Sequence, residues 1–311
     1  MLNYVIKRAL IGILLIITVC IIVFSLIYIM PGDIVNTMYG AHVPEAKRDA
    51  YRAAYGFDQP LYIQFFNWVK KLLHGDLGIS IQSKLPIGQS LKSRMPLTLK
   101  TCGAAMLIQV AIGIPLGILL AYRKDGVLDR ILMAIASFLQ AVPQYWLGVM
   151  LMLLFSVSLR WLPLSGYSSP IHYIMPVAAI SLGGIANIMR ITKAEVLDVY
   201  RQRYVLTAFA KGLKKRAVIV RHVLRNSLIA VVVMVFMEIP WIISGSFIVE
   251  KIFAIPGMGS YMVEAIEKQD VTVVQACVLI IAVLVVVCNI ASDVLTGLLD
   301  PSIRKEITGD R

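Results

Sequence analysis

Long runs of apolar residues, separated by polar segments, dominate the chain. Six of these runs contain no Asp, Glu, Lys or Arg, apart from Glu238. A helix needs about 20 apolar residues to cross the hydrocarbon layer of a membrane, because lipid offers no partner for an unpaired backbone N–H or C=O. We therefore predict six transmembrane helices, at about 9–30, 101–122, 131–159, 171–189, 227–249 and 271–292.

The composition agrees with this pattern. Hydrophobic residues make up 59% of the 311 residues and charged residues only 15%, a balance outside that of soluble domains. The first run follows Lys7 and Arg8, but it is too long for a secretory signal and no small-residue cleavage site follows it, so we interpret it as a retained helix. We predict a single all-α membrane domain over residues 1–311.

Basic residues are distributed unevenly between the segments that join these runs. Lys and Arg near span ends are retained in the cytoplasm, so their distribution predicts the orientation. With the N-terminus inside, the inner segments carry 18 basic and 7 acidic residues, against 12 and 9 in the outer segments. Both termini are therefore predicted to be cytoplasmic. The net charge of +12 follows from this topology and from contact with anionic membrane lipid, so it does not indicate nucleic-acid binding.

Residues that usually carry catalysis or bind metals are sparse. All four cysteines lie inside apolar runs without a CxxC pair, and the four histidines are scattered, so we expect no disulfide or metal site. The chain contains no GxxxxGK(S/T) phosphate loop and no HExxH or GxSxG motif. An intramembrane enzyme would need a nucleophile with a base, or an aspartate pair, within the spans. Transport is therefore the function we expect.

Two long segments interrupt the apolar pattern, an outer one at 31–99 and an inner one at 190–225. The outer segment contains residues 58–74, in which aromatic and aliphatic positions recur at helical spacing before Gly75 and Gly78 interrupt them. We predict an amphipathic helix there. It either lies at the headgroups as a scaffold or contacts a partner that delivers solute.

The inner segment carries ten basic residues and two acidic ones. Charge alone leaves two interpretations open: a segment that only fixes topology and binds anionic headgroups, or a docking element for a cytoplasmic partner. Small residues at Ala208, Ala210 and Gly212 alternate with Phe209 and Lys211, and small side chains let another surface approach closely. Gly212 can also end a short helix.

Several motifs occur in order along nearly the whole chain. In the inner segment they are Thr207-Ala-Phe-Ala-Lys-Gly-Leu213 and Arg221-His-Val-Leu-Arg-Asn-Ser-Leu228. Elsewhere they are Met30-Pro-Gly-Asp33, Gly75-Asp-Leu-Gly78, Trp161-Leu-Pro-Leu-Ser-Gly166, Gly245-Ser-Phe-Ile-Val-Glu250 and Ile252-Phe-Ala-Ile-Pro-Gly-Met-Gly259. Together they resemble the permease subunits of ABC importers, in particular the oligopeptide, dipeptide and nickel permease group. The wider family's loop begins with Glu-Ala-Ala six residues before the glycine, whereas this chain has Leu206, Thr207 and Ala208, as in the peptide and nickel branch.

The resemblance implies a type I ABC importer permease in the cytoplasmic membrane of a bacterium or archaeon. Its partners would be a second, similar permease subunit, two ABC ATPase subunits and an extracytoplasmic solute-binding protein. ATP and Mg²⁺ would be bound by the ATPase subunits, and this chain would hold no cofactor. The inner segment would seat a short helix in a cleft of an ATPase subunit. The residues that match this coupling element are Tyr204, Thr207, Ala208, Ala210, Lys211, Gly212 and Leu213.

Glu238 is the strongest candidate for the translocation path. A charge near the middle of a span costs about 2.5–3.5 kcal/mol, so such a group usually faces a cavity or a partner. We predict that Glu238 meets a positively charged part of the substrate. The alternatives are a protonated side chain or a hydrogen bond to a helix of a neighbouring subunit. By resemblance, a re-entrant element at the outer mouth of the path, the outer gate, contains Glu250, Pro256, Gly257 and Gly259.

The cargo is not determined by these motifs, because permeases for different solutes share them. We predict import of di- and oligopeptides, with nickel or another metal complex, or glutathione, as alternatives. A stand-alone secondary transporter is the competing class, in which Glu238 would serve as a proton or cation site.

Overall fold

The computed structural model describes residues 2–29 and 58–299, together with residues 44, 47, 49, 50, 52 and 53. The Met30–Asp33 motif and the basic residues after Pro301 lie outside this part. The long helices are α1 (Leu2–Ile29), α5 (Ile87–Tyr122), α8 (Ile174–Tyr200), α11 (Arg225–Ile252) and α13 (Val271–Leu299). The shorter elements are α4 (Leu61–Leu73), α6 (Val127–Ala141), α7 (Gln144–Met152), η1 (Leu153–Ser158), η2 (Pro170–Tyr173), α9 (Arg203–Ala210), α10 (Lys215–Val218), η3 (Ile219–Leu224) and α12 (Met258–Glu267).

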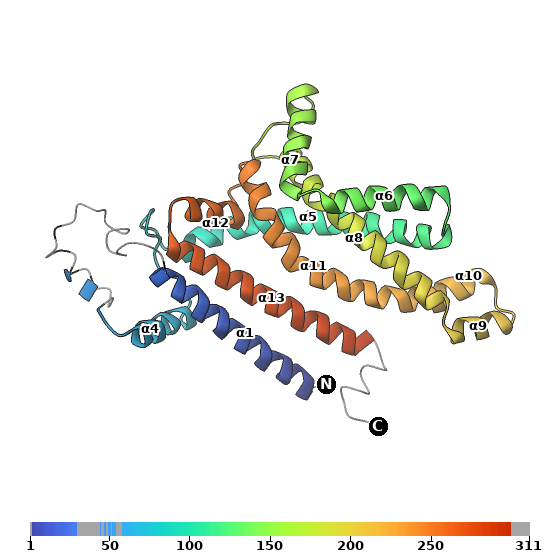
Figure 1. The fold of residues 1–311 in the computed structure, drawn as a ribbon, viewed down its shortest axis with the longest axis horizontal. Helices are drawn as coiled ribbons and strands as arrows, with labels where there is room; N and C mark the ends of the chain where they lie inside the picture. Colours follow the sequence, from blue (N-terminus) through green and yellow to red (C-terminus); the bar gives the residue numbers. More distant parts are fainter. Residues whose placement is uncertain are drawn as a thin grey trace.

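The helices form an elongated bundle (Figure 1). Among the described residues, five helices are long and apolar enough to cross a membrane, and α6 and α7 with η1 make a sixth span if counted together. Helix α1 lies along α13, and α5 packs along α8 (Figure 1). Helices α9 and α10 lie at one end of the bundle, the cytoplasmic end in the predicted orientation, and α12 lies at the other (Figure 1). The all-α, six-span prediction is confirmed.

The third span is broken, which the prediction of one run over 131–159 did not include. Helices α6 and α7 meet at an angle of 100°. Pro143 explains the break, because proline removes a backbone donor and disfavours the helical conformation of the residue before it. Val142 accordingly has an extended backbone, with φ −89° and ψ 127°. The chain turns at this point, so α7 runs in a different direction from α6 while it packs against α8 and α11 (Figure 1).

Several helices extend beyond the predicted spans. Helix α5 begins at Ile87 rather than near 101, and α8 continues to Tyr200 rather than ending near 189. The predicted spans ended where the apolar runs end. A helix does not have to end there, because its polar residues can continue the helix in water outside the lipid. The inner segment at 190–225 is therefore mostly helical, with α9 placed between the end of α8 and α10.

Two glycines allow α5 and α8 to approach closely. A Cβ atom at Gly113 would lie 2.9 Å from the Cβ of Ile188, and one at Gly117 would lie 2.5 Å from the Cβ of Thr192. Side chains at these positions would push the helices apart. Small residues are a common way to bring membrane helices together, since lipid provides no hydrophobic driving force between them.

An amphipathic helix is present where the sequence predicted one. Helix α4 packs its aromatic face on α1, with the ring of Phe24 5.4 Å from that of Phe65 and 5.8 Å from that of Trp68. The helix ends before Gly75, which has a φ of 78°. The side chains of Tyr62 and Phe66 in the same helix are exposed. The described structure shows a scaffold contact with α1, and contact with a delivering partner stays a prediction.

Asp270 joins two segments on the outer side. Its carboxylate accepts hydrogen bonds from the Ser80 hydroxyl at 2.5 Å and from the N–H groups of Ile81 and Gln82, both at 3.2 Å. It also accepts a bond from the Thr272 hydroxyl at 2.8 Å. Burial alone would raise the pKa of Asp270, but these hydrogen bonds outweigh it, so the pKa lies below its ordinary value. We call this contact the outer lock.

Two ion pairs join helices near the cytoplasmic end. Asp129 at the start of α6 lies 2.6 Å from the Nζ of Lys193 in α8, and both side chains are largely buried. The same carboxylate accepts the N–H of Asp125 at 2.9 Å. Arg8 in α1 lies 3.2 Å from Asp293 in α13. These contacts fix α6 to α8 and α1 to α13.

Candidate coupling element and translocation cavity

Helix α9 forms the centre of the inner segment and ends as Gly212 predicts. The N–H of Gly212 donates to the carbonyl of Phe209 at 2.9 Å, and the N–H of Leu213 donates to that of Ala208 at 3.4 Å. Gly212 has a φ of 78°, in the left-handed region that glycine adopts without steric cost. This pair of bonds with a left-handed glycine is a Schellman motif, which satisfies carbonyls at the helix end.

One face of α9 is buried in this chain. Val205 is fully buried and Ala208 is 6% exposed. Both belong to an apolar cluster with residues from the cytoplasmic ends of neighbouring helices: Ala121, Val196, Val218 and Val223. The prediction that Ala208 offers a small surface to a partner is therefore wrong, because its methyl group packs inward. Its small size instead lets α9 lie close to its own bundle.

The other face of α9 is exposed. Arg203, Leu206, Thr207 and Ala210 recur at helical spacing on this side, and Leu213 follows the helix end. The side chains of Leu206 and Leu213 are 59% and 45% exposed. Leu206 was not among the predicted coupling residues. An apolar side chain within a strongly basic segment was the available signal. Lys211 and Gly212 are also exposed, so most of the predicted coupling residues lie on or beside this surface.

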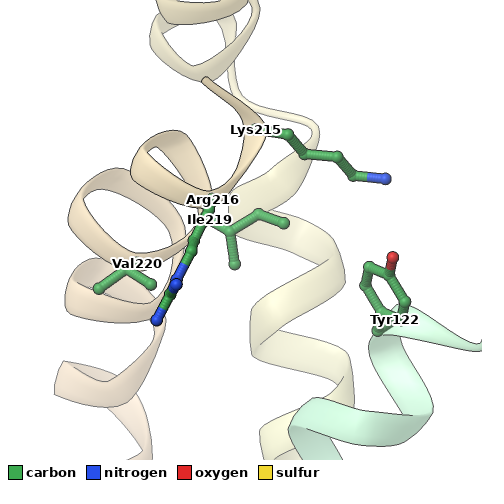
Figure 2. Close-up of a pocket in the computed structure, with 5 residues that line it drawn as sticks. All are labelled: Tyr122, Lys215, Arg216, Ile219 and Val220. Carbon is green, nitrogen blue, oxygen red and sulfur yellow. The ribbon is translucent and has the colours of Figure 1, made fainter. Parts of the chain in front are cut away.

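Side-chain contacts fasten α9 to the spans. The Asn226 side chain at the start of α11 donates to the hydroxyl of Tyr204 at 3.0 Å. Tyr204 therefore anchors α9 to α11. Figure 2 shows a shallow hollow next to this region, with Lys215 of α10 extending on the same side as Tyr122 at the end of α5. The Nζ of Lys215 lies 5.2 Å from the centre of the Tyr122 ring, a cation–π contact.

A cavity of about 610 Å³ lies beside the broken span. Its lining comes from α5, α6, α7, α8 and α11 and includes Glu238, as well as Gln109, Gln140, Gln144, Trp241 and Ser244. Ligand pockets in proteins commonly have volumes of about 300–1,000 Å³. The geometry thus agrees with the prediction that Glu238 faces a cavity.

The carboxylate of Glu238 is held by side chains from other helices. The side-chain amide of Asn187 in α8 donates a hydrogen bond to Glu238 Oε1. Gln140 in α6 donates in turn to Asn187 Oδ1 at 3.4 Å. Asn187 and Gln140 were not predicted, because nothing in the sequence indicates which polar residues of three separate helices will meet. Among the described residues, no group of three or more His, Cys, Asp or Glu side chains could hold a metal ion.

Two glycines make room for amide side chains at this cavity. A Cβ atom at Gly184 would collide with the side chain of Gln109, and one at Gly245 would lie 2.5 Å from Gln144 Oε1. The Gln109 amide donates to the carbonyl of Ile180 at 3.2 Å. The cavity therefore depends on residues without side chains as well as on its polar groups.

The predicted outer-gate residues lie together in one turn. Glu250 is fully buried, and its Oε2 accepts the N–H groups of Gly259 at 2.8 Å and Ser260 at 3.2 Å. These groups open α12, so the carboxylate caps the positive end of that helix. A Cβ atom at Gly257 would collide with this carboxylate. Pro256 lies half-buried next to Gly257. The geometry gives Glu250 a structural role, and gating stays a prediction.

Comparison with known families identifies the class to which this helical bundle belongs. Residues 113–305 match the model of the binding-protein-dependent transport system inner membrane component, and residues 1–102 match the N-terminal model of the same membrane component. The chain belongs to this family of ABC importer permeases. It is a transport component of the inner membrane that crosses it several times, and ATP hydrolysis is carried out by separate ATPase subunits. This confirms the resemblance given by the sequence motifs and replaces the stand-alone transporter as an interpretation.

Individual relatives extend the match to almost the whole chain. It is 36% identical over 304 residues to the glutathione transport system permease protein GsiC of Pectobacterium atrosepticum, which covers 98% of this chain and 99% of the relative. The same identity and coverage hold for the proteins of that name from Escherichia coli and Shigella dysenteriae.

Proposed function

We propose that this chain forms one half of the path of an importer for short peptides, with glutathione as the first candidate. The observation that carries the proposal is the cavity at Glu238, set in a chain whose relatives include glutathione permeases. Gln140 and Gln144, both half-buried, line this cavity and carry amide groups of the kind that pair with the amides of a peptide, whereas Gln109 is buried and bonds to Ile180. The proposal narrows the predicted cargo of di- and oligopeptides towards its small end and keeps nickel complexes as the alternative.

The cavity also supports a second, similar permease subunit. Trp241 is 75% exposed and Ser244 is exposed, next to the half-buried Glu238 on α11. A carboxylate at this depth does not face lipid tails in a stable protein, because burying a charge in lipid is costly. We therefore propose that a partner permease covers this side, and that solute passes between the two subunits.

The exposed face of α9 is proposed to dock in an ATPase subunit. Its surface offers Leu206 and Leu213 for apolar contact, and basic residues surround them. The buried face carries Val205, which packs against the ends of α5, α8 and η3. Movement of an ATPase would therefore be transmitted to several spans at once. ATP and Mg²⁺ belong to the two ATPase subunits in this proposal, with no cofactor on this chain.

Transport follows from this arrangement by alternating access. ATP binding would close the ATPase subunits and move α9, and the permease pair would open outward to receive solute from the binding protein. Hydrolysis would return the pair to its inward-facing state. The turn at Glu250, Pro256, Gly257 and Gly259 lies on the outer side, where solute enters, so we retain it as the proposed outer gate.

The test is uptake in cells that lack other peptide importers and express the complete system. Labelled glutathione, a dipeptide, a longer peptide and a nickel complex are supplied separately, and a strain without this chain is the control. We expect binding-protein-dependent uptake of glutathione and short peptides that stops when ATP is depleted. Uptake of the nickel complex without any peptide uptake would overturn the proposed cargo.

A further inference from the structure

The cavity at Glu238 holds a carboxylate without a cation. None of the residues that line it is Lys, Arg or His. No ion pair of the described residues includes Glu238. An isolated charge at this depth is costly, and a cation that enters the cavity would offset the cost. The cavity therefore favours a positively charged group over a neutral or negative one.

The hydrogen bonds of Glu238 leave one oxygen available. Asn187 donates to Oε1, and Gln140 fixes Asn187 by donating to its side-chain oxygen. Within the described part of the chain, Oε2 accepts no hydrogen bond. Because an amide oxygen of Asn187 is already used by Gln140, the Asn187 amide is oriented with its N–H group towards the carboxylate. Asn187 is thus a positioning residue, and Oε2 is the acceptor that it leaves for a ligand.

An aromatic ring completes the environment of a cation. Trp241 lies three residues after Glu238 on α11, so both side chains project from the same side of the helix. Trp241 lines the same cavity and is 75% exposed. The face of an indole ring attracts a positive charge, and ammonium groups are commonly recognised in this way. A carboxylate and an indole one turn apart suit a compact ammonium group.

We propose that Glu238, oriented by Asn187 and assisted by Trp241, binds the protonated amino group of the transported peptide and thereby selects solutes with a free amino end. The inference rests on the proposed function. It adds that the permease itself discriminates between solutes, independently of the binding protein.

The experiment uses the complete importer in proteoliposomes that contain ATP. Uptake is measured for a labelled tripeptide and for the same tripeptide with an acetylated amino group, each supplied at the concentration that gives equal loading of the binding protein. Wild type is compared with Glu238→Gln, which keeps the size of the side chain, and with Asn187→Leu. Ser137→Ala is the matched control, since Ser137 lies on α6 and its hydroxyl bonds only to its own helix, at Met133.

Glu238→Gln should lower uptake of the free peptide by about tenfold to a hundredfold, the range expected for a hydrogen bond to a charged group, and leave the acetylated peptide unchanged. Asn187→Leu should reduce the ratio of free-peptide uptake to acetylated-peptide uptake by a smaller factor than Glu238→Gln does. It should also raise the KM for the free peptide more than it lowers kcat. Ser137→Ala should not change the ratio. Membrane insertion and basal ATPase activity are measured for each variant, so that misfolding is separated from lost selectivity.

Two results would overturn the inference in different ways. If Glu238→Gln changes uptake of both peptides by the same factor, Glu238 does not recognise the amino group, although peptide transport stands. If the wild-type importer transports neither peptide but transports another solute, the proposed function fails and the inference fails with it.

Discussion

Substitutions of Gly212 can separate two roles of this residue, ending α9 and admitting a partner surface. Any residue with a Cβ atom at a φ of 78° adopts an unfavourable left-handed conformation, which costs roughly 1–2 kcal/mol. No atom of the described structure lies within 4 Å of a Cβ atom built at Gly212. The conformational cost at the Cβ position is therefore the same for alanine and for tryptophan, and neither meets a steric clash at that atom.

Docking in an ATPase cleft would depend on size instead. Gly212→Ala should insert normally and retain most uptake, because the left-handed conformation costs an alanine only about 1–2 kcal/mol and the buried face of α9 still holds the helix. Gly212→Trp adds a large ring on the exposed side and should abolish both uptake and the ATPase activity stimulated by loaded binding protein. Gly212→Asn should be the mildest variant, since asparagine tolerates the left-handed conformation.

The outer side of the chain provides a matched control. Gly75 also has a φ of 78°, ends α4, and has no atom within 4 Å of a Cβ atom. Its N–H donates to the carbonyl of Leu72 at 2.9 Å, as in α9. Gly75→Trp should therefore show only the conformational cost, with ATPase coupling intact. Equal loss of coupling in Gly212→Ala and Gly212→Trp would refute a size-dependent contact and leave only the helix-ending role.

Two further predictions concern stability. Asp129→Ala leaves Lys193 buried without its partner, so it should lower the free energy of unfolding by about 3–5 kcal/mol. The measurement is thermal unfolding in detergent, and the control is Asp49→Ala, which removes an exposed ion pair with Arg52. An unchanged midpoint for Asp129→Ala would contradict the role of this pair. The outer lock has a lowered Asp270 pKa, so its stabilisation is full above the unfolded value of about 3.9 and decreases as pH falls through the lower folded value. The protection factors of the Ile81 and Gln82 amides, which correct the exchange rates for their intrinsic pH dependence, should therefore fall as pH drops through the Asp270 pKa and lose this dependence in Asp270→Asn. Identical profiles for the two proteins would contradict the role of this carboxylate.

The sequence was sufficient for the features that depend on local pattern. Apolar length indicated the spans, and the conformational freedom of Gly212 indicated the end of α9. The break at Pro143 could also have been predicted, because the proline is visible within 131–159. It was overlooked because hydropathy shows only whether a run is long and apolar enough to cross the membrane. It does not show whether the helix bends within that run.

The features that depend on tertiary contacts could not be predicted. Ala208 is small in either role, and only the position of α9 against Val196 and Val218 shows that it faces inward. Glu238 stood out because it is charged within a span. Asn187 and Gln140 are ordinary polar residues in sequence, and their contact depends on how α6, α8 and α11 cross.

The two faces of α9 have an evolutionary consequence. Val205 and Ala208 are constrained by the bundle, since any change there disturbs the ends of several spans. Leu206 and Leu213 are exposed and lie outside the buried cluster, so they can change with smaller effect on folding. A permease of this design can therefore adapt to a different or altered ATPase through a few surface substitutions, while the part that transmits the movement is inherited unchanged.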